Sequence, residues 1–143
     1  MPGRRPSSAS LTLLAVLACS CLVLAGCGDK GSGSSSSGPK IPAGELVDMT
    51  GKKTVTIDAV DNAFQDRYVK VSPGTKVVFK NDGQNPHNVL AADQGAFTDV
   101  DTDQFMPGST AEITFDDSGN FPYYCSLHGT PTRGMNAEII VEG

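Results

Sequence analysis

Four side chains of types that commonly bind metal ions fall in two short segments of the chain. His87 lies in the segment Pro-His-Asn-Val, and Cys125 and His128 lie in the segment Tyr-Cys-Ser-Leu-His, which runs on to Met135. A thiolate, two imidazoles and a thioether suit copper that cycles between Cu(I) and Cu(II), with three strong ligands in a plane and a weak axial sulfur. Zinc accepts two histidines and a cysteine but makes little use of methionine, and calcium and magnesium prefer oxygen ligands. The residue types therefore favour copper.

The spacing of these residues indicates which of them the fold must bring together. Cys125 and His128 are three residues apart at the end of an expected strand, close enough to bind one ion. His87 precedes Cys125 by 38 residues, so the tertiary structure must bring it in from another strand. Taken singly, each residue has an ordinary explanation, because a histidine after proline can be a loop residue and a cysteine or methionine near a strand can belong to the core. The combination and order of the residues indicate a shared site.

Two other methionines compete for the axial position, and one amide stands next to the site. Met49 and Met106 are the rival thioethers, but neither lies in the loop that contains Cys125, so Met135 is the expected ligand. Asn88 directly follows the first histidine. We expect its amide to tie the two ligand segments together by hydrogen bonds, the alternative being an exposed loop amide.

The chain from residue 54 onward alternates apolar and polar residues in short runs, as β-strands do. In the run 54–60, Val55, Ile57 and Ala59 fall on one face of the predicted strand. Further strands are expected at 68–71, 75–81, 87–91, 111–115, 121–125 and 135–142.

Turn residues separate these runs. The Ser-Pro-Gly turn at 72–74 favours a hairpin between the strands on either side of it. Residues 92–104 form an irregular acidic stretch, and no run shows sustained helical spacing of apolar residues. Short strands without helices predict an all-β protein, either a Greek-key β-sandwich or a small barrel.

The string YYCSLHGTPTRGM closely resembles the carboxyl-terminal ligand loop of plastocyanin-like blue copper proteins, the cupredoxins, and PHNV resembles the segment that carries their first histidine. The resemblance covers about residues 54–143. It implies one type 1 copper ion with His87, Cys125 and His128 as equatorial ligands and Met135 as the axial ligand. It also implies a two-sheet Greek-key sandwich with copper at one end, and electron transfer as the activity.

One feature of the ligand loop departs from this family. Six residues separate His128 from Met135, which is a longer loop than plastocyanin and pseudoazurin have. The departure concerns the axial bond and the reduction potential rather than the presence of copper. Pro131 within the loop is expected to stiffen it.

Residues 1–26 have the pattern of a secretory signal peptide. Arg4 and Arg5 precede a run from Leu11 to Leu24 that contains no charged residue and is shorter than the roughly 20 residues of a membrane-spanning helix. The sequence Leu-Ala-Gly-Cys that ends at Cys27 resembles the lipobox of bacterial lipoproteins, in which the cysteine becomes the lipidated first residue. The alternative is an ordinary secretory signal. Lipidation predicts a protein anchored to a membrane outside the cytoplasm, at the outer face of the cytoplasmic membrane or in the periplasm.

Residues 27–51 read as a lipidated cysteine and a flexible linker, because glycine, serine and proline dominate them. The plastocyanin-like domain then occupies residues 52–143. Alternatively, Leu46, Val47 and Met49 add an extra edge strand to the domain.

Four cysteines in an exported chain would usually indicate two disulfides. Cys19 and Cys21 fall in the apolar run of the signal, and Cys27 is expected to carry lipid. Only Cys125 then remains, a thiolate that makes sense outside the cytoplasm if a metal holds it.

The net charge argues against a nucleic-acid partner. The chain carries -5, and loss of the two signal-peptide arginines leaves nine basic residues against 16 acidic ones. Six aspartates either steer a basic partner or are merely solvated: Asp93, Asp99, Asp101, Asp103, Asp116 and Asp117.

Four protein ligands leave no position for a substrate or an activated water, so the sequence favours an electron carrier over an enzyme. The resemblance implies that electrons leave through His128, within an apolar patch of Leu127, Pro131 and Pro86 where a redox protein docks. We expect a monomer. The alternative function is copper binding or delivery with the same ligands, and a metal-free interaction module is disfavoured because every ligand position is occupied by a ligand residue.

Overall fold

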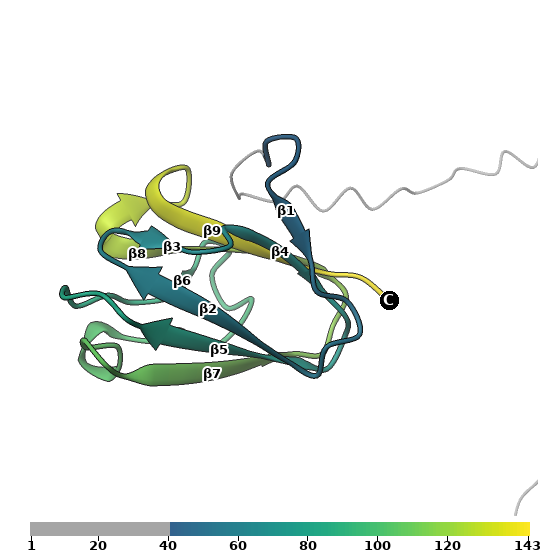
Figure 1. Cartoon of the computed structure of the whole chain (residues 1–143), viewed down its shortest axis with the longest axis horizontal. Helices are drawn as coiled ribbons and strands as arrows, with labels where there is room; N and C mark the ends of the chain where they lie inside the picture. Colours follow the sequence, from purple (N-terminus) through teal and green to yellow (C-terminus); the bar gives the residue numbers. More distant parts are fainter. Residues whose placement is uncertain (1–40) are drawn as a thin grey trace, which may run out of the picture. The chain divides into compact units, whose positions relative to one another are not determined.

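The computed structural model describes residues 41–143, so the predictions for the signal peptide, for Cys19 and Cys21 and for lipidation of Cys27 lie outside the described residues. Two β-sheets pack face to face (Figure 1). The five-stranded sheet has the spatial order β1 (Leu46–Asp48), β4 (Tyr68–Val71), β9 (Arg133–Val141), β8 (Gly119–Thr130) and β6 (Leu90–Ala91). The four-stranded sheet has the order β3 (Ala63–Phe64), β2 (Thr54–Val60), β5 (Thr75–Asn81) and β7 (Thr110–Phe115).

The predicted all-β Greek-key sandwich is confirmed. The one helical element in residues 41–143 is the short 3-10 helix η1 (Thr102–Gln104), which lies in the stretch predicted to be irregular. Within the same residues there is no helix with the length and apolarity needed to span a membrane.

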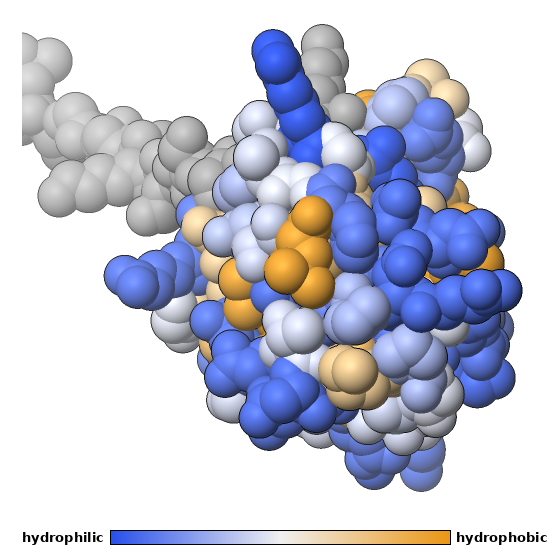
Figure 2. All heavy atoms as spheres, turned by 90° about the vertical axis from the view of Figure 1, so that its left-hand side faces the viewer, coloured by the Kyte–Doolittle hydropathy of each residue, from blue (hydrophilic) through white to orange (hydrophobic). Residues whose placement is uncertain are grey.

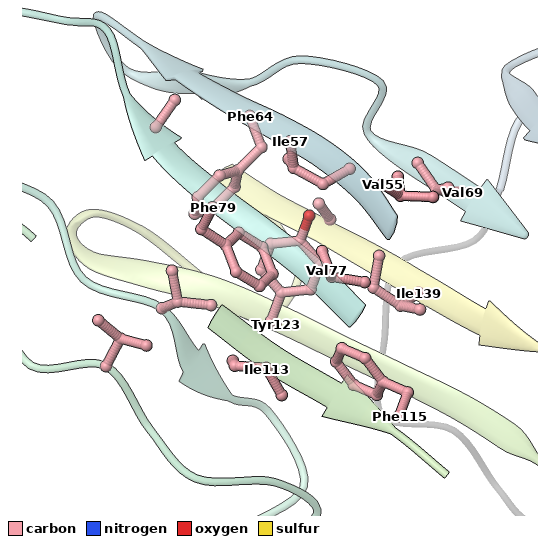
Figure 3. Close-up of a cluster of buried hydrophobic side chains, with 14 of the residues drawn as sticks. Val55, Ile57, Phe64, Val69, Val77, Phe79, Ile113, Phe115, Tyr123 and Ile139 are labelled. Atoms are coloured by element: carbon pink, nitrogen blue, oxygen red, sulfur yellow. The ribbon is translucent and has the colours of Figure 1, made fainter. Parts of the chain in front are cut away.

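The core lies between the sheets and is built from the inward faces of the strands. Val55, Ile57 and Ala59 of β2 are buried as their alternation predicts. Tyr123 of β8 packs edge-on against Phe64 and Phe79, with ring centroids 4.9 and 5.3 Å away, and Figure 3 shows its ring within this apolar cluster. Its hydroxyl has no hydrogen-bond partner in the described part of the chain, and burial raises the pKa of Tyr123 well above its ordinary value.

The predicted hairpin across residues 72–74 is wrong. The turn is present, since the amide of Thr75 donates to the carbonyl of Ser72 at 3.1 Å, but β4 and β5 belong to different sheets. β4 pairs in parallel with β9, and β5 pairs in parallel with β2. The connection therefore crosses the sandwich, which lets Val71 and Val77 both face the core. Alternation of apolar residues predicts the face that a strand buries but not its partner.

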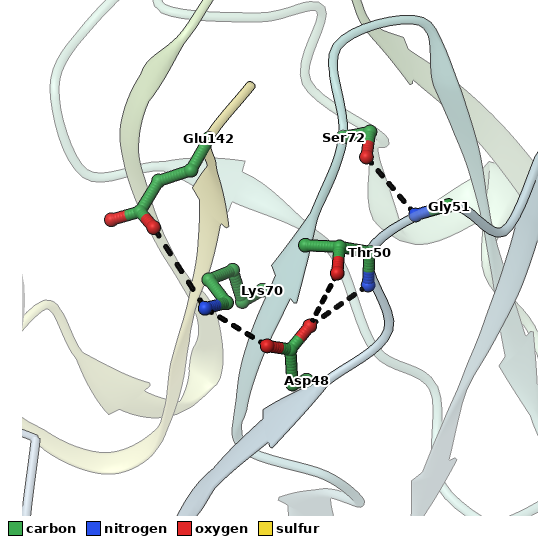
Figure 4. A network of polar contacts seen from close by, with 6 residues as sticks. All are labelled: Asp48, Thr50, Gly51, Lys70, Ser72 and Glu142. Carbon is green, nitrogen blue, oxygen red and sulfur yellow. Dashed lines mark hydrogen bonds and ion pairs between the residues drawn. The ribbon is translucent and has the colours of Figure 1, made fainter.

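Residues 46–51 are joined to the domain rather than lying in a free linker. β1 pairs in parallel with β4 as an edge strand, and Met49 packs against the core. Figure 4 shows the polar contacts that hold this segment: Lys70 lies 2.9 Å from Asp48, Thr50 donates to Asp48 from its amide and its hydroxyl, and the amide of Gly51 donates to Ser72. The hydrogen bond from Lys70, followed by those from Thr50, lowers the pKa of Asp48 to about 2. The extra edge strand given above as the alternative to a linker is thus present, and the folded domain begins before residue 52.

Other strand boundaries differ from expectation in ways that matter for the site. The strand expected over 87–91 is confined to β6, so His87 and Asn88 lie in the loop that precedes it. β8 and β9 are longer than predicted and form an antiparallel pair that ends in a tight turn. β3, of two residues, is too short to give a periodic signal.

Candidate metal centre

An irregularity in the pairing of β8 with β9 creates the carboxyl-terminal half of the site. Tyr124 pairs with Asn136 and Gly129 pairs with Gly134, so the four residues 125–128 of β8 stand opposite a single residue of β9. That single residue is Met135. Such a bulge bends the strand and redirects its side chains. It brings Cys125, His128 and Met135 to one end of the sandwich.

Three ligand atoms converge at this bulge. The Nδ1 atoms of His87 and His128 lie 3.1 Å apart, and Sγ of Cys125 lies 3.8 Å from the first and 3.6 Å from the second. A circle through the three atoms has a radius of about 2.0 Å, and metal ions bind imidazole nitrogen and thiolate sulfur at roughly 2.0–2.3 Å. One ion in this plane can therefore reach all three atoms, and the donor set fits the copper ion inferred from the sequence.

The electrostatic setting favours the neutral form of the His87 imidazole. His87 and Cys125 are fully buried, each with 0% of its surface exposed, whereas His128 is half-buried. Burial, and then the neighbouring His128 ring, lower the pKa of His87 below its ordinary value. A neutral imidazole binds a metal without first losing a proton, so His87 is ready to act as a ligand at neutral pH.

The backbone around His87 is held by β5. The amide of His87 donates to the carbonyl of Phe105 at 3.2 Å. The buried side-chain amide of Asn81, the last residue of β5, donates to the carbonyls of Asn85 and Phe105 at 2.9 and 3.0 Å. Asn81 was not singled out in the sequence. The available signal was an asparagine at a strand end, ahead of a loop containing Gly83, which is too common a pattern to be decisive.

Asn88 links the two ligand segments directly. Its Nδ2 atom donates to the hydroxyl of Ser126 at 2.9 Å, and its Oδ1 atom accepts from the amide of Ser126 at 2.8 Å. Ser126 follows Cys125, and Asn88 follows His87. The pair of hydrogen bonds, which is the arrangement predicted for Asn88, therefore sets the position of one ligand segment relative to the other.

The long loop between His128 and Met135 is taken up by a small hairpin. Thr130 pairs with Arg133 across a turn, and Gly129 pairs with Gly134 at its base. A Cβ atom on Gly129 would lie 2.5 Å from the amide nitrogen of Met135, so only glycine permits this close approach. The extra residues thus extend outward as a turn without separating the two strands at Met135.

Neither rival methionine is buried opposite the bulge. Met49 follows β1, and its amide donates to the carbonyl of Lys70. This contact lies at the end of the sandwich remote from the bulge. Met106 is 45% exposed, whereas Met135 is 1% exposed and stands opposite the bulge. The structure therefore favours Met135 as the thioether of the site.

The surface beside the site combines apolar and polar residues. Figure 2 views this end of the domain and shows apolar residues surrounded by polar ones. Leu127 within the bulge is 51% exposed, and Met106 follows Phe105, whose carbonyl accepts from His87. Pro86 and Pro131, also predicted for this patch, are half-buried.

Comparison with known proteins agrees with this geometry. Residues 51–142 match the model of the copper binding proteins of the plastocyanin/azurin family. Plastocyanin from Rumex obtusifolius is 31% identical over 89 residues, which are 56% of this chain and 88% of that protein. Chloroplastic plastocyanin B from Populus nigra is 33% identical over 88 residues, 55% of this chain, and the chain spans only about half of that relative, 51%.

A solved structure supports the fold. A reduced variant of amicyanin superposes with a TM-score of 0.54 at 21% identity, over 63% of this chain and 83% of amicyanin. Together with the family match and the three converging ligand atoms, these likenesses establish that the chain belongs to the plastocyanin/azurin family of copper-binding proteins.

Proposed function

We propose that this protein is a one-electron carrier whose single type 1 copper ion would be held by His87, Cys125, His128 and Met135. The observation that carries the proposal is the convergence of two Nδ1 atoms and one Sγ atom on a circle of about 2.0 Å radius, within the range of metal–ligand bond lengths. Copper bound by this donor set supplies a reversible change between Cu(I) and Cu(II).

The residues of the chain suit electron transfer better than catalysis. Burial of His87, Cys125 and Met135 keeps water from the site, and four protein ligands leave no open position for a substrate. The Asn88–Ser126 hydrogen bonds and the Gly129–Gly134 pair hold the ligands in one arrangement. A preformed site needs little rearrangement when its charge changes by one.

His128 is the proposed exit for the electron. Unlike His87 it is half-buried, and the exposed side chain of Leu127 precedes it. A redox protein docking over this apolar surface would place its own centre close to the imidazole. Small interfaces, below about 1,200 Å², are typical of redox encounters because they allow fast dissociation.

We extend the proposal to location. The secretory pattern of residues 1–26 and the lipobox-like sequence ending at Cys27 support a lipid-anchored protein outside the cytoplasm. The chain between Cys27 and β1 would then act as a tether that lets the copper end reach a partner at the membrane surface.

Optical spectroscopy of the copper-loaded protein tests the function. We expect an intense blue or green Cu(II) form that bleaches on reduction and is absent in Cys125→Ser, because the colour arises from the copper–thiolate bond. A colourless copper-loaded wild-type protein would overturn the proposal. Ready loss of copper to a chelator, without oxidation or reduction by any redox protein, would indicate copper delivery instead.

A further inference from the structure

A single arginine donates two hydrogen bonds to the residue next to Met135. Arg67 lies between β3 and β4, 69 residues before Asn136 in the sequence. Its Nε atom donates to the backbone carbonyl of Asn136 at 2.6 Å, and its Nη2 atom donates to Oδ1 of the same residue. Asn136 is 1% exposed, so both contacts are shielded from water. Charged donors make hydrogen bonds about twice as strong as neutral ones, and shielding strengthens them further.

The side chain of Asn136 also contacts the turn of the ligand hairpin. Its Nδ2 atom donates to the carbonyl of Thr130 at 3.3 Å, across the base of the turn that joins β8 to β9. Met135 therefore stands between two fixed points: Gly134, which is paired with Gly129, and Asn136, which is held by Arg67. Asn136 is also paired with Tyr124 of β8, and Arg67 adds a contact from outside the hairpin.

Arg67 is in turn held in place. Its guanidinium lies 5.5 Å from the centre of the Tyr68 ring, and its backbone carbonyl accepts from the amide of Glu138 at 2.9 Å. The guanidinium contacts Asn136 and the backbone contacts Glu138, two residues further along the same strand. Arg67 thus connects the start of β4 to the part of β9 that carries Met135.

We infer that Arg67 is a positioning residue for Met135, which sets the place of the thioether relative to the plane of His87, Cys125 and His128. The inference rests on the proposed function for its consequence in copper, because axial sulfur tunes the reduction potential. It accounts for a long ligand loop that still presents its methionine at a defined position. The fork of an arginine suits this role, since its Nε and Nη2 atoms hold two donors in a fixed geometry, whereas a lysine has one flexible nitrogen atom.

Methionine methyl NMR of the metal-free protein tests the positioning directly. The Met135 signal is identified by its loss in Met135→Leu. In Arg67→Ala we expect this signal to move toward the position of a solvent-exposed methionine, and amide exchange at residues 129–136 to accelerate roughly tenfold, as loss of a charged hydrogen bond predicts. Arg67→Lys should fall between Arg67→Ala and wild type. Exchange in β2 and β5 should not change.

Arg133→Ala is the matched control, because Arg133 lies in the same hairpin with an exposed side chain. Its methyl spectrum should equal that of the wild type. If Arg67→Ala gives the same spectrum and exchange rates as Arg133→Ala, the inference is overturned. Arg67→Lys, which keeps the charge, still permits this comparison if Arg67→Ala fails to fold.

The copper-loaded forms separate positioning from mere stabilisation. In the copper-loaded Arg67→Ala variant, the reduction potential and the relative intensities of the copper–thiolate bands should shift toward those of Met135→Leu. If the metal-free spectra change while the copper signatures stay at wild-type values, Arg67 stabilises the hairpin without placing the thioether, and the inference fails. If the wild-type protein gains no colour with copper, the proposed function fails, and the methyl spectra still decide the role of Arg67.

Discussion

His87 and His128 lie 41 residues apart in the sequence, and their Nδ1 atoms lie 3.1 Å apart in the structure. Each nitrogen also faces Sγ of Cys125. The fold thus brings together three ligand atoms from two segments that are far apart in the sequence.

Replacing the axial methionine should change the potential but keep the colour. Met135→Leu removes a weak thioether ligand and leaves the plane of His87, Cys125 and His128 intact, so the blue or green band should persist while the reduction potential rises. A redox titration followed by absorbance measures both. Met106→Leu, on an exposed methionine at the same end of the domain, should leave the potential unchanged. An unchanged potential in Met135→Leu would remove Met135 from the ligand set.

Loss of the Asn88 amide should loosen the link between the ligand segments. Asn88→Ala leaves the amide of Ser126 without its 2.8 Å acceptor, and we expect the free energy of unfolding to fall by about 1–3 kcal/mol. Copper affinity should fall roughly 10–100-fold, as for other residues that orient metal ligands. Denaturant titration and chelator competition measure these two effects. Asn120→Ala, on an exposed asparagine of β8, should show neither.

The core tyrosine is expected to tolerate loss of its hydroxyl. Within residues 41–143 the hydroxyl of Tyr123 has no hydrogen-bond partner, and a buried polar group of this kind costs about 1–3 kcal/mol. Tyr123→Phe keeps the packing against Phe64 and Phe79, so thermal unfolding should occur at the same temperature or higher. Tyr124→Phe, on the half-buried neighbour, is the comparison. A marked loss of stability in Tyr123→Phe alone would reveal a partner for the hydroxyl.

The contact that holds the edge strand β1 should depend on pH. The pKa of Asp48 is lowered from 3.8 to about 2, so its contribution to stability is present above about pH 4 and disappears as the pH falls through 2. Asp48→Asn should therefore be less stable than wild type at pH 7, and the difference should shrink between pH 4 and pH 2. Chemical denaturation at several pH values measures it.

A control for this pH effect comes from the same cluster. Glu142 lies 3.8 Å from Lys70, farther than Asp48 at 2.9 Å, and its side chain is 66% exposed. Glu142→Gln should give a smaller difference at every pH. A difference between Asp48→Asn and wild type that stays constant down to pH 2 would show that the carboxylate charge of Asp48 does not stabilise the fold.

Membrane attachment should depend on one cysteine. Cys27→Ala removes the proposed lipidation site, so the protein should move from the membrane fraction to the soluble extracytoplasmic fraction. Fractionation and immunoblotting of cells that express each form measure this. Ser126→Ala, outside the lipobox-like segment, should remain at the membrane. Retention of Cys27→Ala at the membrane would argue against the lipid anchor.

Strand content and ligand types could be predicted from the sequence because they depend on local properties. Alternation identifies the buried face of β2, since successive side chains of a strand point to opposite sides. The thiolate, imidazole and thioether groups near Cys125 indicate copper, because ligand softness is a property of each side chain. The same local reasoning gave the wrong partner for β4, since pairing depends on residues far away in the chain.

By itself the sequence determined the chemistry of this protein. It shows which side chains are able to bind copper, and it shows that these side chains lie near the ends of short amphipathic strands. Only the tertiary structure decided how those side chains meet. Three features bring them together: the bulge opposite Met135, the Gly129–Gly134 pair that closes the long loop, and the hydrogen bonds from Arg67 to Asn136. Each depends on a close approach of two backbones or on a hydrogen bond between distant residues. Such contacts leave no periodic trace in a sequence, because each depends on the geometry of two segments rather than on the composition of one.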